Sequence, residues 1–193
     1  MKIIGVTGGV GSGKSEVLRF LEREYKAHIC QLDEVTKALQ RRGTACFKKI
    51  VECFGEDMVG EDGELDRAKL GQAVFGSAEK LNALNAIVHP EVKRWVRFDI
   101  ERKKETQVPL YVIEAALLLE AGYQDICDEL WYIFVPQDIR RERLKVSRGY
   151  SDERIDKMFA SQLTDEAFQD GCTVVIDNGG TFENTIRQIG DRL

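Results

Sequence analysis

One short segment of the chain combines residue types and spacing that suit phosphate chemistry. Within GVTGGVGSGKSE (residues 5–16), Gly8, Gly13, Lys14 and Ser15 fit the pattern Gly-x-x-x-x-Gly-Lys-Ser/Thr. Glycine lets backbone N–H groups converge on phosphate oxygens without a side-chain collision. In this pattern the lysine reaches the β- and γ-phosphates, and the serine hydroxyl binds Mg²⁺. The segment therefore predicts a phosphate-binding loop that holds a nucleoside triphosphate.

The flanking sequence decides between this interpretation and a glycine-rich turn with a chance lysine. Residues 2–6, KIIGV, are a β-branched run typical of a buried strand, and from Lys14 onward apolar residues recur at helical spacing. A helix that begins there adds its N–H groups and the positive end of its dipole to the anion site. We expect the nucleotide to be bound by Gly8, Gly9, Val10, Gly11, Ser12, Gly13, Lys14, Ser15 and Glu16.

Four further apolar runs indicate an α/β fold. They cover residues 27–33, 109–119, 130–135 and 173–176. Runs that are apolar on both faces suit strands of a parallel sheet covered by helices. We expect a five-stranded parallel sheet of the P-loop NTPase type, flanked by helices. Residues 1–33, 108–136 and 172–193 then form the nucleotide-binding core.

The segment from residue 34 to residue 107 predicts a helical insertion. Three helical patterns end at Gly43, Gly55 and Gly76. Ser77 is a suitable N-cap for a helix over residues 78–89, and Pro90 suits the first turn of another over residues 91–104. The residue before a proline is normally where a helix ends, so we expect a helix end at His89.

A second charged helical segment, residues 137–171, predicts a lid. It carries a basic cluster of Arg140, Arg143 and Arg148 in an acidic chain. Such a lid closes over the site, excludes water and places guanidinium groups against the transferring phosphate. The alternative is a solvated helix whose arginines pair with Asp138 and Glu142. A closing helix with Thr181 at its N-cap completes the chain.

Composition limits the partners and the compartment. The formal net charge is −5, which argues against a surface for nucleic acid, and 43% hydrophobic residues are typical of a globular protein. No apolar run is long enough to cross a bilayer, so no membrane partner is expected. Five scattered cysteines without a Cys-x-x-Cys pair predict neither disulfides nor a zinc site. We expect a cytoplasmic monomer or small homo-oligomer.

The class of nucleotide-binding protein follows from what surrounds the loop. No Asn-Lys-x-Asp segment, which a GTPase uses to read guanine, occurs in the chain. A short chain with a helical insertion and a late arginine-rich segment favours a kinase of a small molecule. A kinase of another nucleotide or metabolite hydroxyl and a non-catalytic ATP-binding regulatory module remain as alternatives.

Over essentially its full length the sequence resembles the dephospho-CoA kinase family. The matching features are the loop, Asp33, LNAIVHP (residues 84–90), EAALLLEAG (residues 114–122), Val135-Pro136, Arg143, Gln162 in SQL, and VIDNGG from Val175. There are departures. Ala116 and Leu119 replace a proline and a phenylalanine, and the family's second lid arginine falls at Ser147, with Arg148 adjacent.

The resemblance implies transfer of the γ-phosphoryl of ATP to the ribose 3′-hydroxyl of dephospho-CoA, the last step of CoA biosynthesis. It implies that Asp33 is the catalytic base and that Lys14 and Arg143 stabilise the transferring phosphate. It also places His89 and Gln162 on the substrate side and Asn178 beside the adenine. ATP and Mg²⁺ are the expected cofactors, with Ser15 and Glu114 as metal ligands.

Each of these roles has a plainer structural alternative. Asp33 is also a suitable N-cap for a helix that starts at Glu34. Glu114 could be a carboxylate with a structural partner, and Asn178 a turn residue. His89 could simply end a helix, where the negative end of the dipole favours it.

Overall fold

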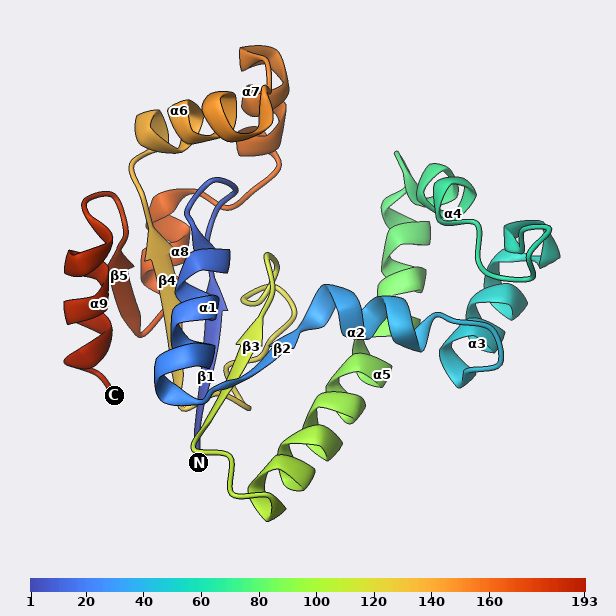
Figure 1. Ribbon diagram of the computed structural model, residues 1–193. Coiled ribbons are helices and arrows are strands. Elements are labelled where there is room, and N and C mark those ends of the chain that lie inside the picture. The colour runs from blue at the N-terminus through green and yellow to red at the C-terminus, as the bar shows by residue number, and fades with distance from the viewer. The chain divides into compact units, whose positions relative to one another are not determined.

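The computed structural model describes residues 1–193, which divide into two compact units, residues 1–30 with 104–193 and residues 31–103. The first unit contains a five-stranded sheet in the order β2-β3-β1-β4-β5 (Figure 1). The strands are β1 (Lys2–Thr7), β2 (His28–Gln31), β3 (Leu110–Glu114), β4 (Glu129–Phe134) and β5 (Val174–Asp177). β1 pairs in parallel with β3 and β4, and β4 pairs in parallel with β5. The predicted five-stranded parallel sheet is confirmed.

Helices cover both faces of this sheet, which is why its strands are apolar on both sides. On one face, α1 (Lys14–Tyr25) and α9 (Phe182–Gly190) pack on alternate residues of the strands. Ile4 and Val6 of β1 are fully buried there. On the other face, Tyr132 of β4 stacks on Phe168 of α8 (Asp165–Gly171), with ring centroids 4.8 Å apart. β1 therefore lies at the centre of the core, and the loop that follows it leaves from the middle of the sheet edge.

The predicted lid segment forms α6 (Gln137–Arg148), α7 (Asp152–Ala160) and the short α8. Arg141 of α6 pairs with Asp152 and Asp156 of α7, and Lys145 pairs with Asp152 at 2.8 Å. α7 ends at Ala160, so Gln162 lies in the connection between α7 and α8. The sequence does not predict α8 as a separate helix. Its seven residues are too few for a clear helical period, and Thr164 caps it through the Ala167 N–H.

The second unit is helical, as the sequence predicts. It contains α2 (Leu32–Leu39), α3 (Ala45–Phe54), a 3₁₀ turn η1 (Glu56–Met58), α4 (Arg67–Val74) and most of α5 (Ala78–Glu105). Side chains cap three of these helices, and Ser77 is the one that the sequence predicts. Thr44 accepts from the Phe47 N–H, Asp66 from the Ala68 N–H, and Ser77 from the Lys80 N–H at 3.3 Å.

The prediction of a helix end at His89 and a new helix after Pro90 is wrong, because α5 continues through both residues. Val88, Val92, Val96 and Ile100 recur every fourth residue and are at most 7% exposed. Burying this apolar stripe outweighs the roughly 3 kcal/mol that an internal proline costs a helix. α5 changes direction along its length (Figure 1). A proline inside a helix is a common cause of such a kink.

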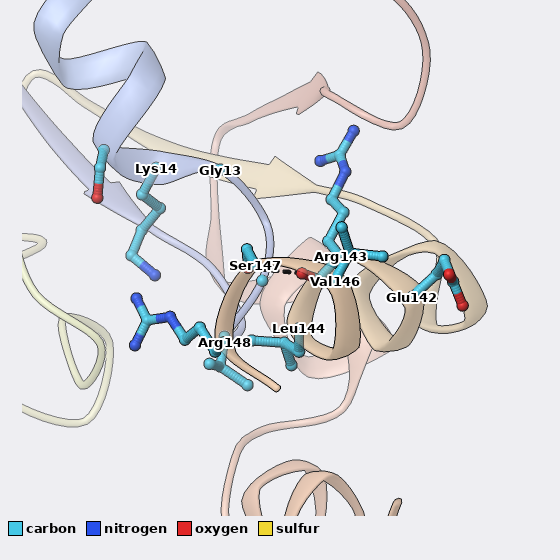
Figure 2. Close-up of a pocket in the computed structure, with 11 residues that line it drawn as sticks. Gly13, Lys14, Glu142, Arg143, Leu144, Val146, Ser147 and Arg148 are labelled. Carbon is cyan, nitrogen blue, oxygen red and sulfur yellow. Dashed lines mark hydrogen bonds between the residues drawn. The ribbon is translucent and has the colours of Figure 1, made fainter. Parts of the chain in front are cut away.

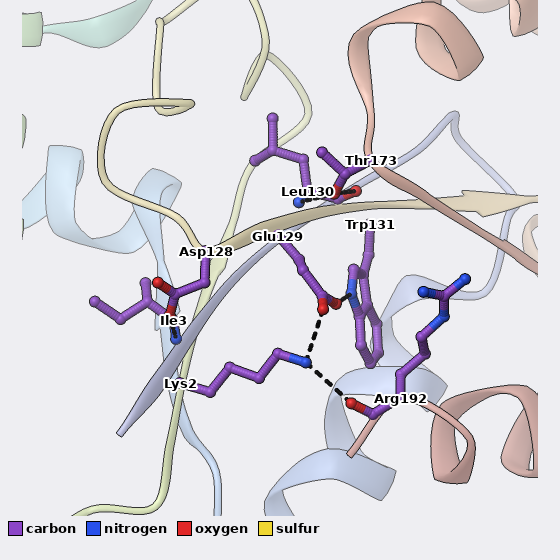
Figure 3. Close-up of polar contacts among 8 residues, drawn as sticks. All are labelled: Lys2, Ile3, Asp128, Glu129, Leu130, Trp131, Thr173 and Arg192. Atoms are coloured by element: carbon purple, nitrogen blue, oxygen red, sulfur yellow. Dashed lines mark hydrogen bonds and ion pairs between the residues drawn. The ribbon is translucent and has the colours of Figure 1, made fainter.

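A polar network ties the sheet together at its amino-terminal edge, away from the loop that follows β1 (Figure 3). Lys2 Nζ lies 2.8 Å from Glu129 Oε1 and donates to the backbone oxygen of Arg192 at 2.9 Å. Trp131 Nε1 donates to Glu129 at 2.7 Å. Burial raises the pKa of Glu129, but hydrogen bonds from Lys2 and Trp131 outweigh it, so the pKa lies below its usual value. Glu129 is therefore ionised at neutral pH and links the strands to the end of the chain.

No helix is long and apolar enough to cross a membrane. No disulfide bond joins any of the five cysteines. Their surroundings differ, because Cys53 is exposed whereas Cys127 and Cys172 are partly buried.

Alkylation should separate these thiols. Burial raises the pKa of Cys127 to about 12 and that of Cys172 to about 11, and the thiolate is the species that reacts. With iodoacetamide at about pH 8, Cys53 should be modified first while Cys127 and Cys172 stay unmodified in the native protein. Peptide mass spectrometry over time measures this. Labelling of Cys127 as fast as Cys53 would contradict the burial described here.

Candidate active site

The loop between β1 and α1 presents backbone N–H groups at a helix start. Gly13 is the N-cap of α1 with φ 82°, and no side chain caps the helix. The N-terminal end of the helix dipole is therefore directed at the loop. The Glu16 N–H donates to Gly13 O at 2.9 Å, so the helical ladder uses it. Of the predicted nucleotide-binding residues, Lys14, Ser15 and Glu16 thus belong to α1 rather than to the loop.

Gly13 is required for two reasons. Its φ of 82° is a conformation that side chains disfavour, and a Cβ there would lie 2.4 Å from Asn178 Nδ2. The loop backbone therefore packs directly on the side chain of Asn178.

The side chain of Asn178 binds the backbone of the loop. It is 3% exposed, and its Nδ2 donates to Ser12 O at 2.8 Å. Its Oδ1 accepts a hydrogen bond from Thr185 Oγ1 at 2.8 Å, and its N–H donates to Phe134 O at 2.8 Å. The side-chain amide is thus used to fix the loop. The sequence prediction of a contact with adenine gave no indication of this role, since nothing near VIDNGG points to Ser12.

A cavity of about 570 Å³ opens beside the loop. It lies between the loop and α6 (Figure 2). The lining residues are Val10, Gly11, Gly13, Lys14, Ser15, Glu142, Arg143, Leu144, Val146, Ser147 and Arg148. Three cationic side chains against a single carboxylate give the cavity a positive charge, which suits a polyphosphate.

The cationic side chains of this cavity point in two directions. Figure 2 shows the ends of Lys14 and Arg148 directed toward the same space. Lys14 Nζ donates to Gly8 O at 2.7 Å. Arg143 is directed away from them, and its Nη2 donates to Asn178 O at 2.9 Å. Ser147 is uncharged, and its Oγ donates to Arg143 O at 2.6 Å. Among residues 146–148, which all line the cavity, Arg148 is therefore the one that carries a charge.

The residues predicted to hold Mg²⁺ lie in the first turn of α1 and at the end of β3. Ser15 lines the cavity from the first turn of α1. Glu114 is the last residue of β3 and is in register with Val6 of β1, just before the loop. A hydroxyl and a carboxylate suit Mg²⁺, which protein sites typically bind through one or two side chains together with phosphate oxygens. The structure contains no group of three or more His, Cys, Asp or Glu side chains that could hold a metal ion.

The remaining predicted residues fall in different places. Gln162 Oε1 accepts a hydrogen bond from the Val10 N–H at 3.0 Å, so Gln162 contacts the loop itself. Asp33 and His89 belong to the second unit. Asp33 is exposed in the first turn of α2, whose N-cap is Gln31 without a side-chain cap, so the N-cap alternative for Asp33 is wrong. His89 is exposed on the continuous helix α5.

Removing the Asn178 side chain should weaken both the fold and nucleotide binding. Asn178→Ala leaves the buried Ser12 carbonyl and Thr185 hydroxyl without this partner, at a cost of about 1–3 kcal/mol in the free energy of unfolding. Urea denaturation measures this cost. Asn184→Ala, an exposed asparagine on α9, is the matched control and should change stability by less than about 0.5 kcal/mol. Equal effects of the two changes would contradict the role given to Asn178.

Comparisons with known proteins identify a family for this chain. A family model described as dephospho-CoA kinase matches residues 2–184. A dephospho-CoA kinase from Carboxydothermus hydrogenoformans is 38% identical over 190 residues, which are 98% of this chain and 91% of that protein. The crystal structure of TT1252 from Thermus thermophilus is 31% identical, with a TM-score of 0.82 over 99% of this chain and 95% of that one.

A more distant structure, a dephospho-CoA kinase from Campylobacter jejuni, bears on the fold alone. It is 19% identical and has a TM-score of 0.72, with 100% of this chain and 96% of that one covered. Because both the family model and a relative of more than one-third identity span almost the entire sequence, the chain belongs to the dephospho-CoA kinase family.

Proposed function

We propose that this ATP-dependent kinase transfers the γ-phosphoryl of ATP to the ribose 3′-hydroxyl of dephospho-CoA, giving CoA and ADP. The observation that carries the proposal is the positive cavity in which Lys14 and Arg148 face the same space beside the loop. Phosphoryl transfer depends on positioning and on neutralising charge, and this cavity supplies both.

The loop and α1 would hold the β- and γ-phosphates. The Ser12 hydroxyl is buried and makes no hydrogen bond within the protein, so a phosphate oxygen or a water bound with it would remove an energetic cost. Lys14 would exchange its hydrogen bond to Gly8 O for a phosphate oxygen. This exchange leaves the lysine charge close to the loop in both states.

Ser15 and Glu114 would hold Mg²⁺, Ser15 by its hydroxyl and Glu114 directly or through water. When bound there, the ion would neutralise part of the charge of the phosphates.

Residues 137–171 would act as a lid whose arginines stabilise the transferring phosphoryl group. Arg148 already faces Lys14 across the cavity. Arg143, which now donates to Asn178 O, would turn to the phosphate when nucleotide binds. A guanidinium donates several hydrogen bonds in a fixed plane and suits this task. Arg148 thus takes over from the arginine that Ser147 replaces.

Residues 34–107 would bind the acceptor, and Asp33 would deprotonate its hydroxyl. Asp33 is exposed and follows β2 by two residues. Ligands of open parallel sheets bind beyond the carboxyl ends of the strands, which supports this assignment. His89, exposed on α5, remains a candidate contact with the acceptor. Gln162 is better explained on the nucleotide side, because it binds Val10. A cytoplasmic location suits these substrates.

The acceptor is tested directly by ADP release. A coupled assay should show ATP consumption with dephospho-CoA and little with nucleoside monophosphates or small polyols. Position-specific analysis of the product should place the new phosphate on the ribose 3′-oxygen. Faster turnover with one of the other acceptors would replace dephospho-CoA as the substrate. ATP binding without ADP release in the presence of any acceptor would favour a regulatory module.

Asp33→Asn separates a catalytic base from a residue that only supports the fold. The amide keeps the size of the side chain but accepts no proton, so kcat should fall about 10²-fold or more while the KM for ATP stays within about twofold. Asp57→Asn, an exposed aspartate in η1 of the same unit, should leave kcat unchanged. Near-normal turnover of Asp33→Asn would refute the assignment.

A further inference from the structure

The second glycine of the phosphate loop, Gly9, lies against an arginine of the lid. A Cβ on Gly9 would lie 2.0 Å from Arg140 Nη1 and 3.3 Å from Gln162 Oε1. The φ of Gly9 is outside the left-handed region, so its backbone conformation alone does not demand glycine. Its neighbours do. The space that a side chain would take is filled by the guanidinium of Arg140.

Two contacts hold Arg140 in this position, one with Asp165 and one with Phe159. It is 7% exposed, and its Nη2 donates to Asp165 Oδ1 at 3.0 Å. Its guanidinium carbon lies 4.9 Å from the centre of the Phe159 ring, which adds a cation–π contact. Asp165 in turn accepts a hydrogen bond from Tyr132 Oη at 2.6 Å. A charge that is buried and paired in this way has little freedom to move.

Tyr132 connects this pair to the sheet. It is 1% exposed on β4 and in register with Thr7, the last residue of β1 before the loop. Burial, together with the hydrogen bond to Asp165, raises the pKa of Tyr132 far above its usual value. The phenol therefore stays protonated and donates to Asp165 at every physiological pH. Arg140 is thus fixed relative to the strand from which the loop emerges.

Gln162 contacts the next residue of the loop. Its Oε1 accepts a hydrogen bond from the Val10 N–H at 3.0 Å, and its own backbone N–H donates to Phe159 O at 3.2 Å. The segment between α7 and α8 thereby reaches the same half of the loop as Arg140. Two side chains of residues 137–171 hold two consecutive loop residues, one by packing and one by a hydrogen bond.

We propose that Arg140 and Gln162 are positioning residues that clamp the first half of the phosphate loop, and that Gly9 is glycine in order to receive Arg140. The clamp fixes the backbone of Gly9 and Val10 so that the loop is already in shape when the polyphosphate arrives. It rests on the proposed function only in taking this loop as the phosphate site. Neither residue needs to touch the nucleotide or the acceptor.

The hydrogen bond of Gln162 is tested with a matched pair of variants. Gln162→Met keeps the length of the side chain and removes the acceptor oxygen, so the dissociation constant of ADP should rise about five- to tenfold. Gln137→Met is the control, since Gln137 lines the neighbouring cavity with Gln162 and is exposed. Calorimetric titration with ADP measures both. An unchanged ADP affinity of Gln162→Met, or an equal loss in Gln137→Met, would overturn the clamp.

A double-mutant cycle tests the fit between Gly9 and Arg140. Gly9→Ala alone should weaken ADP binding about tenfold or more, because the new methyl group collides with a buried guanidinium. In the Arg140→Ala background the same change should cost less than about threefold, so the two effects are not additive. An equal loss in both backgrounds would show that Gly9 is needed for another reason and would refute the proposal. Thermal melting checks that each variant is folded; if Arg140→Ala is not, the glutamine pair decides.

Steady-state kinetics separate a positioning role from general damage. The clamp predicts a higher KM for ATP in Gln162→Met with an unchanged KM for dephospho-CoA, whereas a merely weakened fold would lower the melting temperature and spare the KM for ATP. The ADP titration needs no acceptor. Failure of dephospho-CoA as a substrate would therefore sink the proposed function and leave the test of the clamp intact.

Discussion

The site depends on holding a flexible loop in one shape. Glycine has the largest conformational freedom of any residue, so a loop rich in glycine is disordered unless its neighbours fix it. Here the side chain of Asn178 donates a hydrogen bond to Ser12 O, and Lys14, at the start of α1, donates one to Gly8 O. Gln162 holds Val10 from the lid side. All three hydrogen bonds end on the backbone of the loop, so the shape of the loop is set by contacts with its main chain.

The two edges of the sheet in the first unit differ in how their charges are paired. At the amino-terminal edge of the sheet, Lys2, Glu129 and Trp131 form a network whose charges pair with one another and with the end of the chain. At the carboxyl edge, α6 brings cationic side chains to a cavity with only one carboxylate. Charge is neutralised where it serves stability and left in excess where a polyphosphate would bind.

The sequence predicts what depends on local pattern and misses what depends on distant contacts. The loop and the five strands are visible because each has a short, continuous pattern of apolar residues or glycines. The continuation of α5 through Pro90 is not visible, because the burial of Val88, Val92 and Val96 outweighs a local rule. The contact between Asn178 and Ser12 spans 166 residues of chain, and that between Gln162 and Val10 spans 152. No spacing rule reports such a pair, which is why the sequence does not predict the contacts that Asn178 and Gln162 make with the loop.

The end of α6 brings an arginine to the cavity although Ser147 stands where the resemblance leads us to expect one. Successive residues of a helix point about 100° apart, so an arginine displaced by one position would ordinarily face elsewhere. Arg148, however, is the last residue of α6, with Gly149 in the left-handed conformation after it, and its long side chain reaches back to Lys14 (Figure 2). A column-by-column alignment would score Ser147 as the loss of a cation. The cavity nevertheless receives a guanidinium from this turn of the helix, because Arg148 lines it together with Lys14.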